Sequence, residues 1–498
     1  MFHFNGETAP PPIDFTIVLL YNRGTVGKGT ERRRARQDYG DEVQGMEQAQ
    51  EKGFSSLESL CREYRANNQI PGDLFDKYQV KRGLRNADGT GVVAGLTNIS
   101  NVHGYIIEDE EKTPDEGKLI YRGIDLRELV DGCMRDDRFG FEEVEWLLLF
   151  GHLPTKSQLD RFNEILNNNR ELPEYFAEDM IIKAPSANIM NKLARSVLAL
   201  YSYDDTPDDP SLENNMRQSV ELIARLPTIM TYAYQVKRRH FDKKSMYFHP
   251  LMPEHHTAEA ILYALRPDKK FSDREAKLLD LCMMLHAEHG GGNNSTFTSR
   301  VLSSSGTDIY STIAASIGSL KGPKHGGANH RVMTMMKEIM ANVENWENED
   351  EVEAYLEKIL RKEAGDGSGL IYGIGHAVYT LSDPRAVILK EKAENLAKEK
   401  GMDREFDLFR LVERLAPGAF ERVKGSKKVV SANVDFYSGL IYQMLGIPED
   451  LFTPMFAVSR IGGWCAHRME EMFTGGRIIR PAYRSLTKFQ NYTDLKDR

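Results

Sequence analysis

Cysteine is scarce in this sequence, and no pair of cysteines has a spacing that suggests a shared site. Only four occur in 498 residues, and none belongs to a C-x-x-C motif. Their scattered spacing argues against a disulfide framework and against a zinc site built from thiolates. A reducing, intracellular setting fits this pattern best. The four are Cys61, Cys133, Cys282 and Cys465.

Long apolar runs and an excess of positive charge are also missing. The early run from Phe15 to Tyr21 is too short to span a bilayer, and the residues before it include Glu7 and Asp14. It is therefore neither a membrane span nor a secretory signal. With 65 basic and 74 acidic residues the net charge is −9, so no bulk positive field attracts nucleic acid or an anionic membrane. An anionic substrate would need locally gathered Arg and His.

The first 50 residues show no helical or strand periodicity. They contain Pro10, Pro11 and Pro12 and a basic run over 32–36, so we predict that 1–50 is a disordered extension. Better helix formers follow Met46, where the ordered protein is expected to begin. An Arg-rich mitochondrial presequence is the alternative, although acidic residues are unusual in one. We expect a cytoplasmic location, or the mitochondrial matrix if the extension is a presequence.

Beyond this extension the pattern is mostly helical. Residues 89–107 are small and β-branched, which predicts a short strand pair before the acidic run 108–112, expected to be a solvated loop. The apolar stretch 141–150 predicts a helix ended by Gly151 and Pro154, and Ser157 is expected to cap the next helix, giving a helical hairpin.

Three further segments predict where the core lies. The apolar positions from Val352 to Leu360 follow a helical period, and Gly365 is expected to end that helix. Residues 278–285 are apolar nearly all round, which indicates a helix buried on every side. A methionine stripe over 333–340 is interpreted as core filling. We predict a mainly α protein with a minor β element near the N-terminus.

Five histidines cluster within 91 residues and form the first functional signal. Two of them, His286 and His289, have a spacing that metal ligands often show. The spacing differs from the H-E-x-x-H and H-x-x-E-H motifs of metalloproteases, and no third ligand is evident, so we predict no metal site. The five are His286, His289, His325, His330 and His376.

A glycine-rich stretch surrounds the last of these histidines. It begins like a dinucleotide-binding fingerprint at Gly373, but Val378 stands at the third glycine position and no βαβ unit surrounds it, which excludes a Rossmann site. Glycines between 365 and 375 would still let the backbone approach a ligand closely, or let a loop act as a hinge.

Taken in order, the motifs of this chain resemble those of the citrate synthase family, over about residues 90–485. That family condenses acyl-coenzyme A (acyl-CoA) thioesters with oxaloacetate. Each motif alone is weak, but seven in one order are specific. They are Tyr121–Asp125, Leu153–Thr155, His289 with Asn293 or Asn294, Gly322–Asn329, Gly373–Arg385, Asn433–Gly439 and Val458–Arg460.

The resemblance implies a role for each matching residue. Asp435 is expected to take a proton from the thioester α-carbon, His325 to stabilise the enol or enolate, and His376 to protonate the oxaloacetate carbonyl. Citrate and CoA would be released. The expected oxaloacetate ligands are His289, Arg385, Arg460 and, from the partner subunit of a homodimer, Arg480; Leu370, Gly373 and Gly375 are expected to contact CoA.

The resemblance also implies a two-domain, all-helical fold with no tightly bound cofactor. A large domain is expected over 55–326 and 446–498, and a small domain over 327–445. Thr380 stands where relatives often have a basic residue facing a CoA phosphate. Relatives commonly have Glu at the position of Gly290 and an apolar residue at that of Lys324. Lys424, Lys427 and Lys428 could supply the missing charge, or could form a solvated loop.

Three alternatives stay open at this point. A 2-methylcitrate synthase would use propionyl-CoA with the same catalytic residues, and one methylene in an apolar pocket discriminates by only about 1–3 kcal/mol. A catalytically idle relative would act as a binding protein, which the complete set of acid–base and Arg residues argues against. A metal hydrolase built on His286 and His289 is the third.

Overall fold

The computed structural model describes residues 57–108, 111–376, 378–425 and 430–497. They divide into two units, the first ending at Arg82 and the second starting at Gly83. The described part of the first unit contains a helical stretch over 57–67 and α2 (Asp73–Lys77). The predicted disordered extension and the predicted start of order after Met46 lie outside the described residues.

The second unit contains one antiparallel sheet within the described residues, in the order β1 (Ser100–Glu108), β2 (Glu111–Tyr121), β3 (Ile124–Asp125). The predicted strand pair within 89–107 is therefore wrong, because the second strand begins inside the acidic run, at Glu111. The backbones of Glu108 and Glu111 pair across the hairpin instead of forming a loop. Further along, β2 buries Leu119 and Tyr121 completely.

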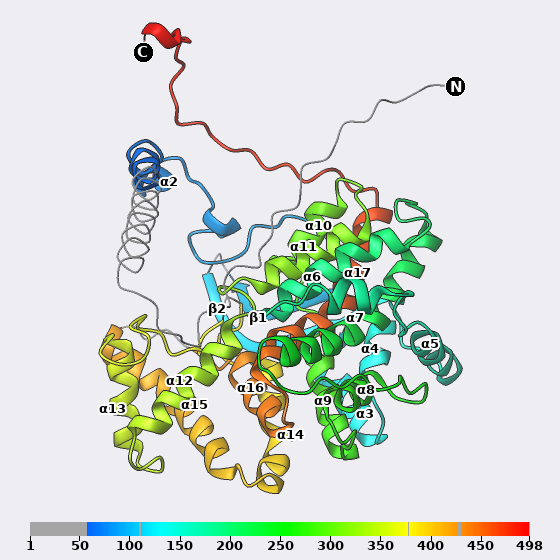
Figure 1. Cartoon of the computed structure of the whole chain (residues 1–498). Helices are drawn as coiled ribbons and strands as arrows, with labels where there is room; N and C mark the ends of the chain where they lie inside the picture. Colours follow the sequence, from blue (N-terminus) through cyan, green and yellow to red (C-terminus); the bar gives the residue numbers. More distant parts are fainter. Residues whose placement is uncertain (1–56, 109–110, 377, 426–429, 498) are drawn as a thin grey trace, which may run out of the picture. The chain divides into compact units, whose positions relative to one another are not determined.

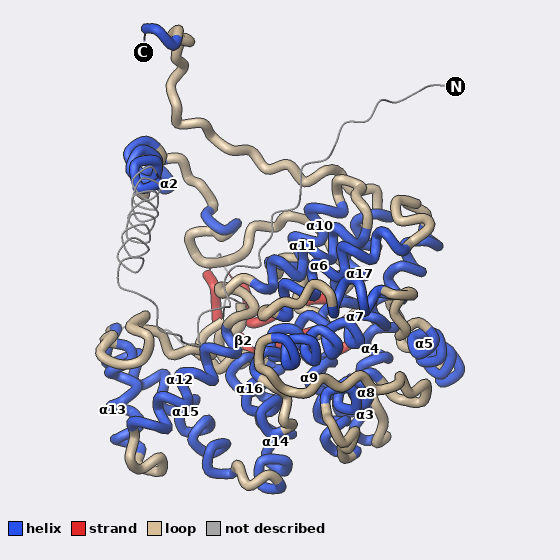
Figure 2. The backbone as a smooth tube through the Cα atoms, viewed as in Figure 1, coloured by secondary structure: helices blue, strands red, loops and turns tan. Residues whose placement is uncertain are grey.

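Helices form most of the second unit (Figure 1), and Figure 2 shows them surrounding the small sheet. The mainly α class is confirmed. Short 3₁₀ turns occur at Arg82–Leu84, Tyr201–Tyr203, Glu449–Leu451 and Leu495–Asp497, and a π-helical segment at Ala177–Ile182. The α-helices are α3 (Leu126–Arg135), α4 (Phe141–Phe150), α5 (Lys156–Asn168), α6 (Ile189–Leu200), α7 (Leu212–His240), α8 (Thr257–Leu265), α9 (Asp273–His286), α10 (Asn294–Ser303), α11 (Ile309–Lys321), α12 (Ala328–Asn342), α13 (Glu349–Leu360), α14 (Pro384–Glu399), α15 (Asp403–Lys424), α16 (Val434–Met444) and α17 (Phe452–Phe473).

The predicted hairpin of α4 and α5 is present. Gly151 ends α4 in the left-handed conformation, with a φ of 82°, which glycine adopts without a Cβ clash. The expected cap at Ser157 is wrong. Thr155 caps α5 instead, because its hydroxyl accepts the N–H of Gln158 while the Gln158 side chain accepts the N–H of Thr155.

The core predictions hold, with one boundary corrected. Every residue of α9 from Leu278 to His286 is buried, as an all-round apolar helix requires. Met333, Met335 and Met336 are also buried. Helix α13 ends at Leu360 and not at Gly365, because Lys362 already adopts a positive φ of 67°, which no continuing helix allows.

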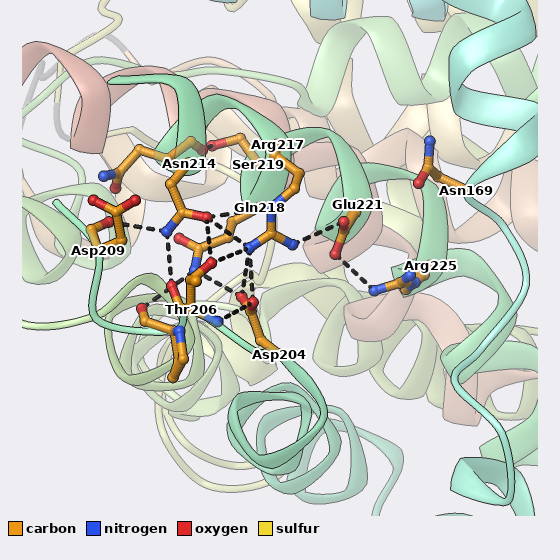
Figure 3. A network of polar contacts seen from close by, with 12 residues as sticks. Asn169, Asp204, Thr206, Asp209, Asn214, Arg217, Gln218, Ser219, Glu221 and Arg225 are labelled. Carbon is orange, nitrogen blue, oxygen red and sulfur yellow. Dashed lines mark hydrogen bonds and ion pairs between the residues drawn. The ribbon is translucent and has the colours of Figure 1, made fainter. Parts of the chain in front are cut away.

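A polar network fixes the start of the long helix α7 (Figure 3). Asp204 accepts hydrogen bonds from Arg217 at 2.7 Å, from Gln218 at 2.8 Å and from the Tyr310 hydroxyl at 2.7 Å. Because Tyr310 belongs to α11, the network joins two helices of the core. Because these polar groups are hydrogen-bonded to one another, they can orient the helices without the cost of burying a polar group that has no partner.

Helices α12 to α16 pack on one another, with α12 and α14 on α16 and α13 on α15. Helix α17 contacts α4, α6, α7, α9, α10 and α11, and also α12. The predicted large and small domains stay a prediction. In the part of the chain that the structure describes, no helix has the length and apolar character needed to cross a membrane. The expected cytoplasmic location also stays a prediction.

Candidate active site

Two segments that carry predicted catalytic residues are hydrogen-bonded to each other. The Asn433 N–H donates to the Gly373 carbonyl at 2.9 Å, and the Gly375 N–H donates to the Ser431 carbonyl at 2.7 Å. Gly373 has a φ of 79°, and a Cβ added to it would lie 2.7 Å from a methyl of Val332. Only glycine allows this approach, so the loop before His376 is held against the start of α16.

His376 follows this loop, and its ring is oriented by the backbone. Its Nδ1 accepts the N–H groups of Val378 at 3.1 Å and Tyr379 at 3.0 Å. Burial lowers the pKa of His376 to about 4, with Asp383 opposing this shift and Arg385 adding to it. The ring is therefore neutral at pH 7, and its proton is on Nε2, the nitrogen free to donate to a ligand.

His289, just beyond α9, stands edge-on to His376, with ring centroids 5.1 Å apart. It is buried, and its Nε2 has no hydrogen-bond partner among the described residues. Burial, with the charge of Arg385, lowers its pKa well below the usual value. A buried ring nitrogen left without a partner is costly in a folded protein, and a bound ligand would satisfy it.

Arg460 of α17 is fully buried, and most of its guanidinium has no partner. Its Nε donates to the carbonyl of His286 at 2.6 Å, whereas Nη1 and Nη2 have no hydrogen-bond partner among the described residues. Burial lowers its pKa to about 10, so the side chain remains charged at pH 7. A buried cation with unpaired N–H groups can bind a carboxylate or another anion.

Arg385, in the first turn of α14, is also buried but is paired. It binds Asp383 through two hydrogen bonds, Nε to Oδ1 at 3.0 Å and Nη2 to Oδ2 at 2.8 Å. Asp383 also accepts the N–H of Val434 at 3.1 Å. Asp383 therefore links Arg385 to the start of α16, and part of the Arg385 fork is already occupied.

Asp435 is the second residue of α16, whose N-terminal cap Asn433 accepts the Asp435 N–H at 3.0 Å. Burial raises the pKa of Asp435 to about 6, because Arg385 and Arg460 offset the desolvation only in part. A carboxylate with this pKa is a stronger base than an exposed aspartate and is still mostly ionised at pH 7.

His325 lies in the turn between α11 and α12, with its Nε2 3.1 Å from the Ser295 hydroxyl. Trp464 donates its indole N–H to the same hydroxyl at 3.2 Å, and the hydroxyl donates to Asn293 Oδ1 at 2.9 Å. Burial, together with Arg460, lowers the pKa of His325 to about 4. The ring is therefore neutral at pH 7.

Six of the seven predicted catalytic and oxaloacetate-binding residues gather at one place. Besides burial, the Arg460 charge lowers the pKa of His289 and His325 and opposes the rise at Asp435. The Arg385 charge likewise lowers the pKa of His289 and His376 and opposes the rise at Asp435. Interactions of this kind require the charges to lie close together.

Other predicted residues lie outside this group. Arg480 is exposed, in a stretch after α17 without helix or strand, and no hydrogen bond or ion pair among the described residues joins it to the six. Leu370 is 51% exposed. Lys424 donates to the Leu360 carbonyl at 3.1 Å, while Lys427 and Lys428 lie outside the described residues.

Sequence reasoning missed Ser295, Trp464, Asp383 and Tyr379. Ser295 lies within two residues of Asn293, which the motif comparison had singled out, and Asp383 and Tyr379 lie inside the Gly373–Arg385 motif. Only Trp464 had no local signal, because its contact with Ser295 joins residues 169 positions apart.

The fold and the site define an all-helical protein in which a carboxylate and neutral imidazoles surround buried cations. The sequence pattern of the family described as "Citrate synthase, C-terminal domain" matches residues 86–482. This chain belongs to the citrate synthase family and is an acyltransferase of that family.

Individual relatives agree with this assignment. The citrate synthase of Synechocystis sp. is 36% identical over 414 residues, covering 82% of this chain and 91% of the relative. The 2-methylcitrate synthase of Shewanella oneidensis is 33% identical over 364 residues, covering 73% and 87%. The crystal structure of citrate synthase from Pyrobaculum aerophilum is 29% identical, with a TM-score of 0.67, and covers 82% of this chain and 94% of that chain.

Proposed function

We propose that this protein condenses acetyl-CoA with oxaloacetate to give citrate and CoA, a step of the tricarboxylic acid cycle. The observation that carries the proposal is the buried guanidinium of Arg460. Its Nη1 and Nη2 have no hydrogen-bond partner among the described residues, and it lies near Asp435, whose pKa is raised, and near neutral imidazoles. A site of this kind suits a keto acid with two carboxylates, because a planar guanidinium forms two parallel hydrogen bonds to a carboxylate and a Lys ammonium does not.

In the first step, Asp435 takes a proton from the methyl group of the thioester. The thioester oxygen gains negative charge as this proton leaves, and His325 donates a hydrogen bond to it. This donation requires a proton on Nδ1 of His325. In this step the Ser295 hydroxyl, which accepts the Trp464 N–H, turns its proton from Asn293 Oδ1 to His325 Nε2.

In the second step, the thioester α-carbon attacks the carbonyl carbon of oxaloacetate. The proton on His376 Nε2 passes to the carbonyl oxygen, which becomes the hydroxyl of the product. The Nδ1 contacts with two backbone N–H groups support this role, because they leave Nε2 as the donor. Water then hydrolyses the citryl thioester and releases citrate and CoA, and the proton that Asp435 took from the thioester returns through solvent to His376 Nε2. His289, Arg385 and Arg460 hold the oxaloacetate carboxylates.

The working unit in this proposal is a homodimer in which Arg480 enters the site of the partner subunit. The exposure of Arg480 and its separation from the other six residues agree with such a role. Leu370, Gly373 and Gly375 would contact CoA through their backbone.

The test is thiol release from acetyl-CoA and from propionyl-CoA, each with and without oxaloacetate. We expect release that depends on oxaloacetate and a higher kcat/KM for acetyl-CoA. Asp435→Asn should lower kcat by about 10²–10⁴, the usual contribution of a positioned base. Asp407→Asn, at an exposed position of α15, is the matched control and should keep wild-type activity.

Two results would change the proposal. If neither thioester releases thiol in response to oxaloacetate, the condensation reaction is wrong. A higher kcat/KM for propionyl-CoA would instead identify a 2-methylcitrate synthase, the activity named for the Shewanella oneidensis relative.

A further inference from the structure

The segment after His376 lies directly against the β1–β2 hairpin, and two hairpin glycines permit this contact. A Cβ added to Gly104 would lie 2.8 Å from the Tyr379 Cα, and one added to Gly117 would lie 2.0 Å from the Ser382 carbonyl oxygen and 2.9 Å from the Tyr379 ring. These distances are too short for any side chain. The hairpin and the 378–382 segment therefore pack backbone to backbone.

Hydrogen bonds reinforce this packing. The Thr380 hydroxyl donates to the Gly104 carbonyl at 2.5 Å, beside the β-bulge between His103 and Tyr105. The Gly117 N–H donates to the Ser382 hydroxyl at 3.3 Å. Both hairpin strands thus hold the segment, and Thr380 has a structural partner at the position where relatives often carry a basic residue.

Tyr379 contacts both the hairpin and His376. Its ring is 2% exposed and stacks on the His376 imidazole, with centroids 4.6 Å apart and planes at 26°. Its backbone N–H also donates to His376 Nδ1. The same ring meets His289 edge-on at 5.5 Å. Its hydroxyl has no hydrogen-bond partner among the described residues.

We propose that Tyr379 is a positioning residue for His376, clamped by the hairpin through Gly104 and Gly117. The ring covers one face of the imidazole and excludes water, and the backbone N–H holds Nδ1 as an acceptor. Both effects keep the imidazole neutral with its proton on Nε2. This inference rests on the proposed function for its effect on rate, but the state of His376 can be measured without any activity.

The experiment compares Tyr379→Leu and Tyr379→Phe with wild type. Tyr379→Leu removes the stacked ring, so we expect kcat to fall about tenfold or more, because small misplacements of a catalytic group are costly, while KM for acetyl-CoA stays within about twofold. Tyr379→Phe keeps the ring and should retain at least about half of wild-type kcat.

The second readout is the titration of His376, followed by NMR of ¹³C-labelled histidine and assigned with His376→Asn. In wild type and Tyr379→Phe the imidazole should stay neutral down to about pH 5. In Tyr379→Leu it should gain its proton between about pH 5 and 7, as a hydrated imidazole does. This measurement tests the inference independently of the proposed function. The proposed function would instead fail if the wild-type protein released no thiol in response to oxaloacetate.

Gly117→Ala tests the clamp from the hairpin side and serves if Tyr379→Leu does not fold. We expect it to lower kcat and to move the His376 titration in the same direction. Gly95→Ala, where an added Cβ meets no atom within 4 Å, is the matched control and should change neither. An unchanged His376 titration in both Tyr379→Leu and Gly117→Ala would overturn the inference, as would an equal loss of kcat in Tyr379→Phe and Tyr379→Leu.

Discussion

At the scale of single residues, burial changes the site's acids and bases in opposite directions. It raises the pKa of Asp435 to about 6 and lowers that of His325 and His376 to about 4. Desolvation disfavours whichever form is charged, so one cause explains all three shifts. At pH 7 the site therefore combines an ionised carboxylate with two neutral imidazoles, which can donate hydrogen bonds without a charge cost.

The pH dependence of the rate should follow from these values. The base must be ionised, so kcat/KM for the thioester should fall about tenfold per unit below pH 6, as Asp435 gains its proton. The imidazoles remain neutral down to about pH 4 and add no loss near pH 6.5. Initial rates of thiol release between pH 4.5 and 8.5 measure this fall in kcat/KM. A rate that stays constant down to pH 5 would contradict the base assignment to Asp435.

Most of the site residues could be predicted from short motifs, but their partners could not. His325 and Asp435 stand in characteristic Gly-rich or Asn-Val-Asp contexts. The Ser295 hydroxyl that contacts His325 is also bound by Trp464, and that contact exists only after three distant segments have packed. Similarly, nothing in the sequence indicated that Asp383 occupies part of the Arg385 fork.

At the scale of elements, apolar periodicity was a good guide to helices and a poor one to strands. The buried helix α9 was predicted because its apolar residues cover every face. Strand β2 was missed because Pro114 and several charged residues interrupt its pattern. The N-terminal cap of α5 was misplaced by two residues for a local reason, the reciprocal bonds of Thr155 and Gln158.

Gly373→Ala should damage the site through the element that carries His376. The new Cβ would lie 2.7 Å from Val332 and 2.8 Å from Phe436, and a positive φ adds strain. We expect a stability loss of about 1–3 kcal/mol, as for other overpacked core positions, and a kcat lower by about tenfold or more.

Thermal melting and thiol release measure the two effects. Gly318→Ala in α11, where the added Cβ meets no atom within 4 Å, is the control and should keep both properties. Wild-type activity in Gly373→Ala would mean that the loop tolerates displacement.

At the scale of the whole molecule, the question is whether one chain holds a complete site. Six of the seven predicted catalytic and oxaloacetate-binding residues converge within the chain, and Arg480 does not. The family resemblance predicted both its role as an oxaloacetate ligand and its entry from the partner subunit. The proposed homodimer therefore accounts for the one residue that the described chain leaves apart.

Hybrid dimers test this sharing. Arg480→Ala and Asp435→Asn subunits should each have low activity alone. A purified hybrid of the two contains one site with Asp435 from one subunit and Arg480 from the other, so it should recover about half of the wild-type rate per dimer. Differently tagged subunits, purified through both tags, provide the material. No recovery in confirmed hybrids would place Arg480 outside the partner's site.

The hydrogen bonds between Gly373, Gly375 and residues 431–433 have a consequence for motion. Together with the Asp383 contact to Val434, they make His376, Arg385 and Asp435 parts of one mechanical block. His289, His325 and Arg460 are carried by other elements. If this block moved toward those three residues, Asp435, the proposed proton acceptor, and His376, the proposed proton donor, would move together. The distance between Asp435 and His376 would therefore stay the same during the movement.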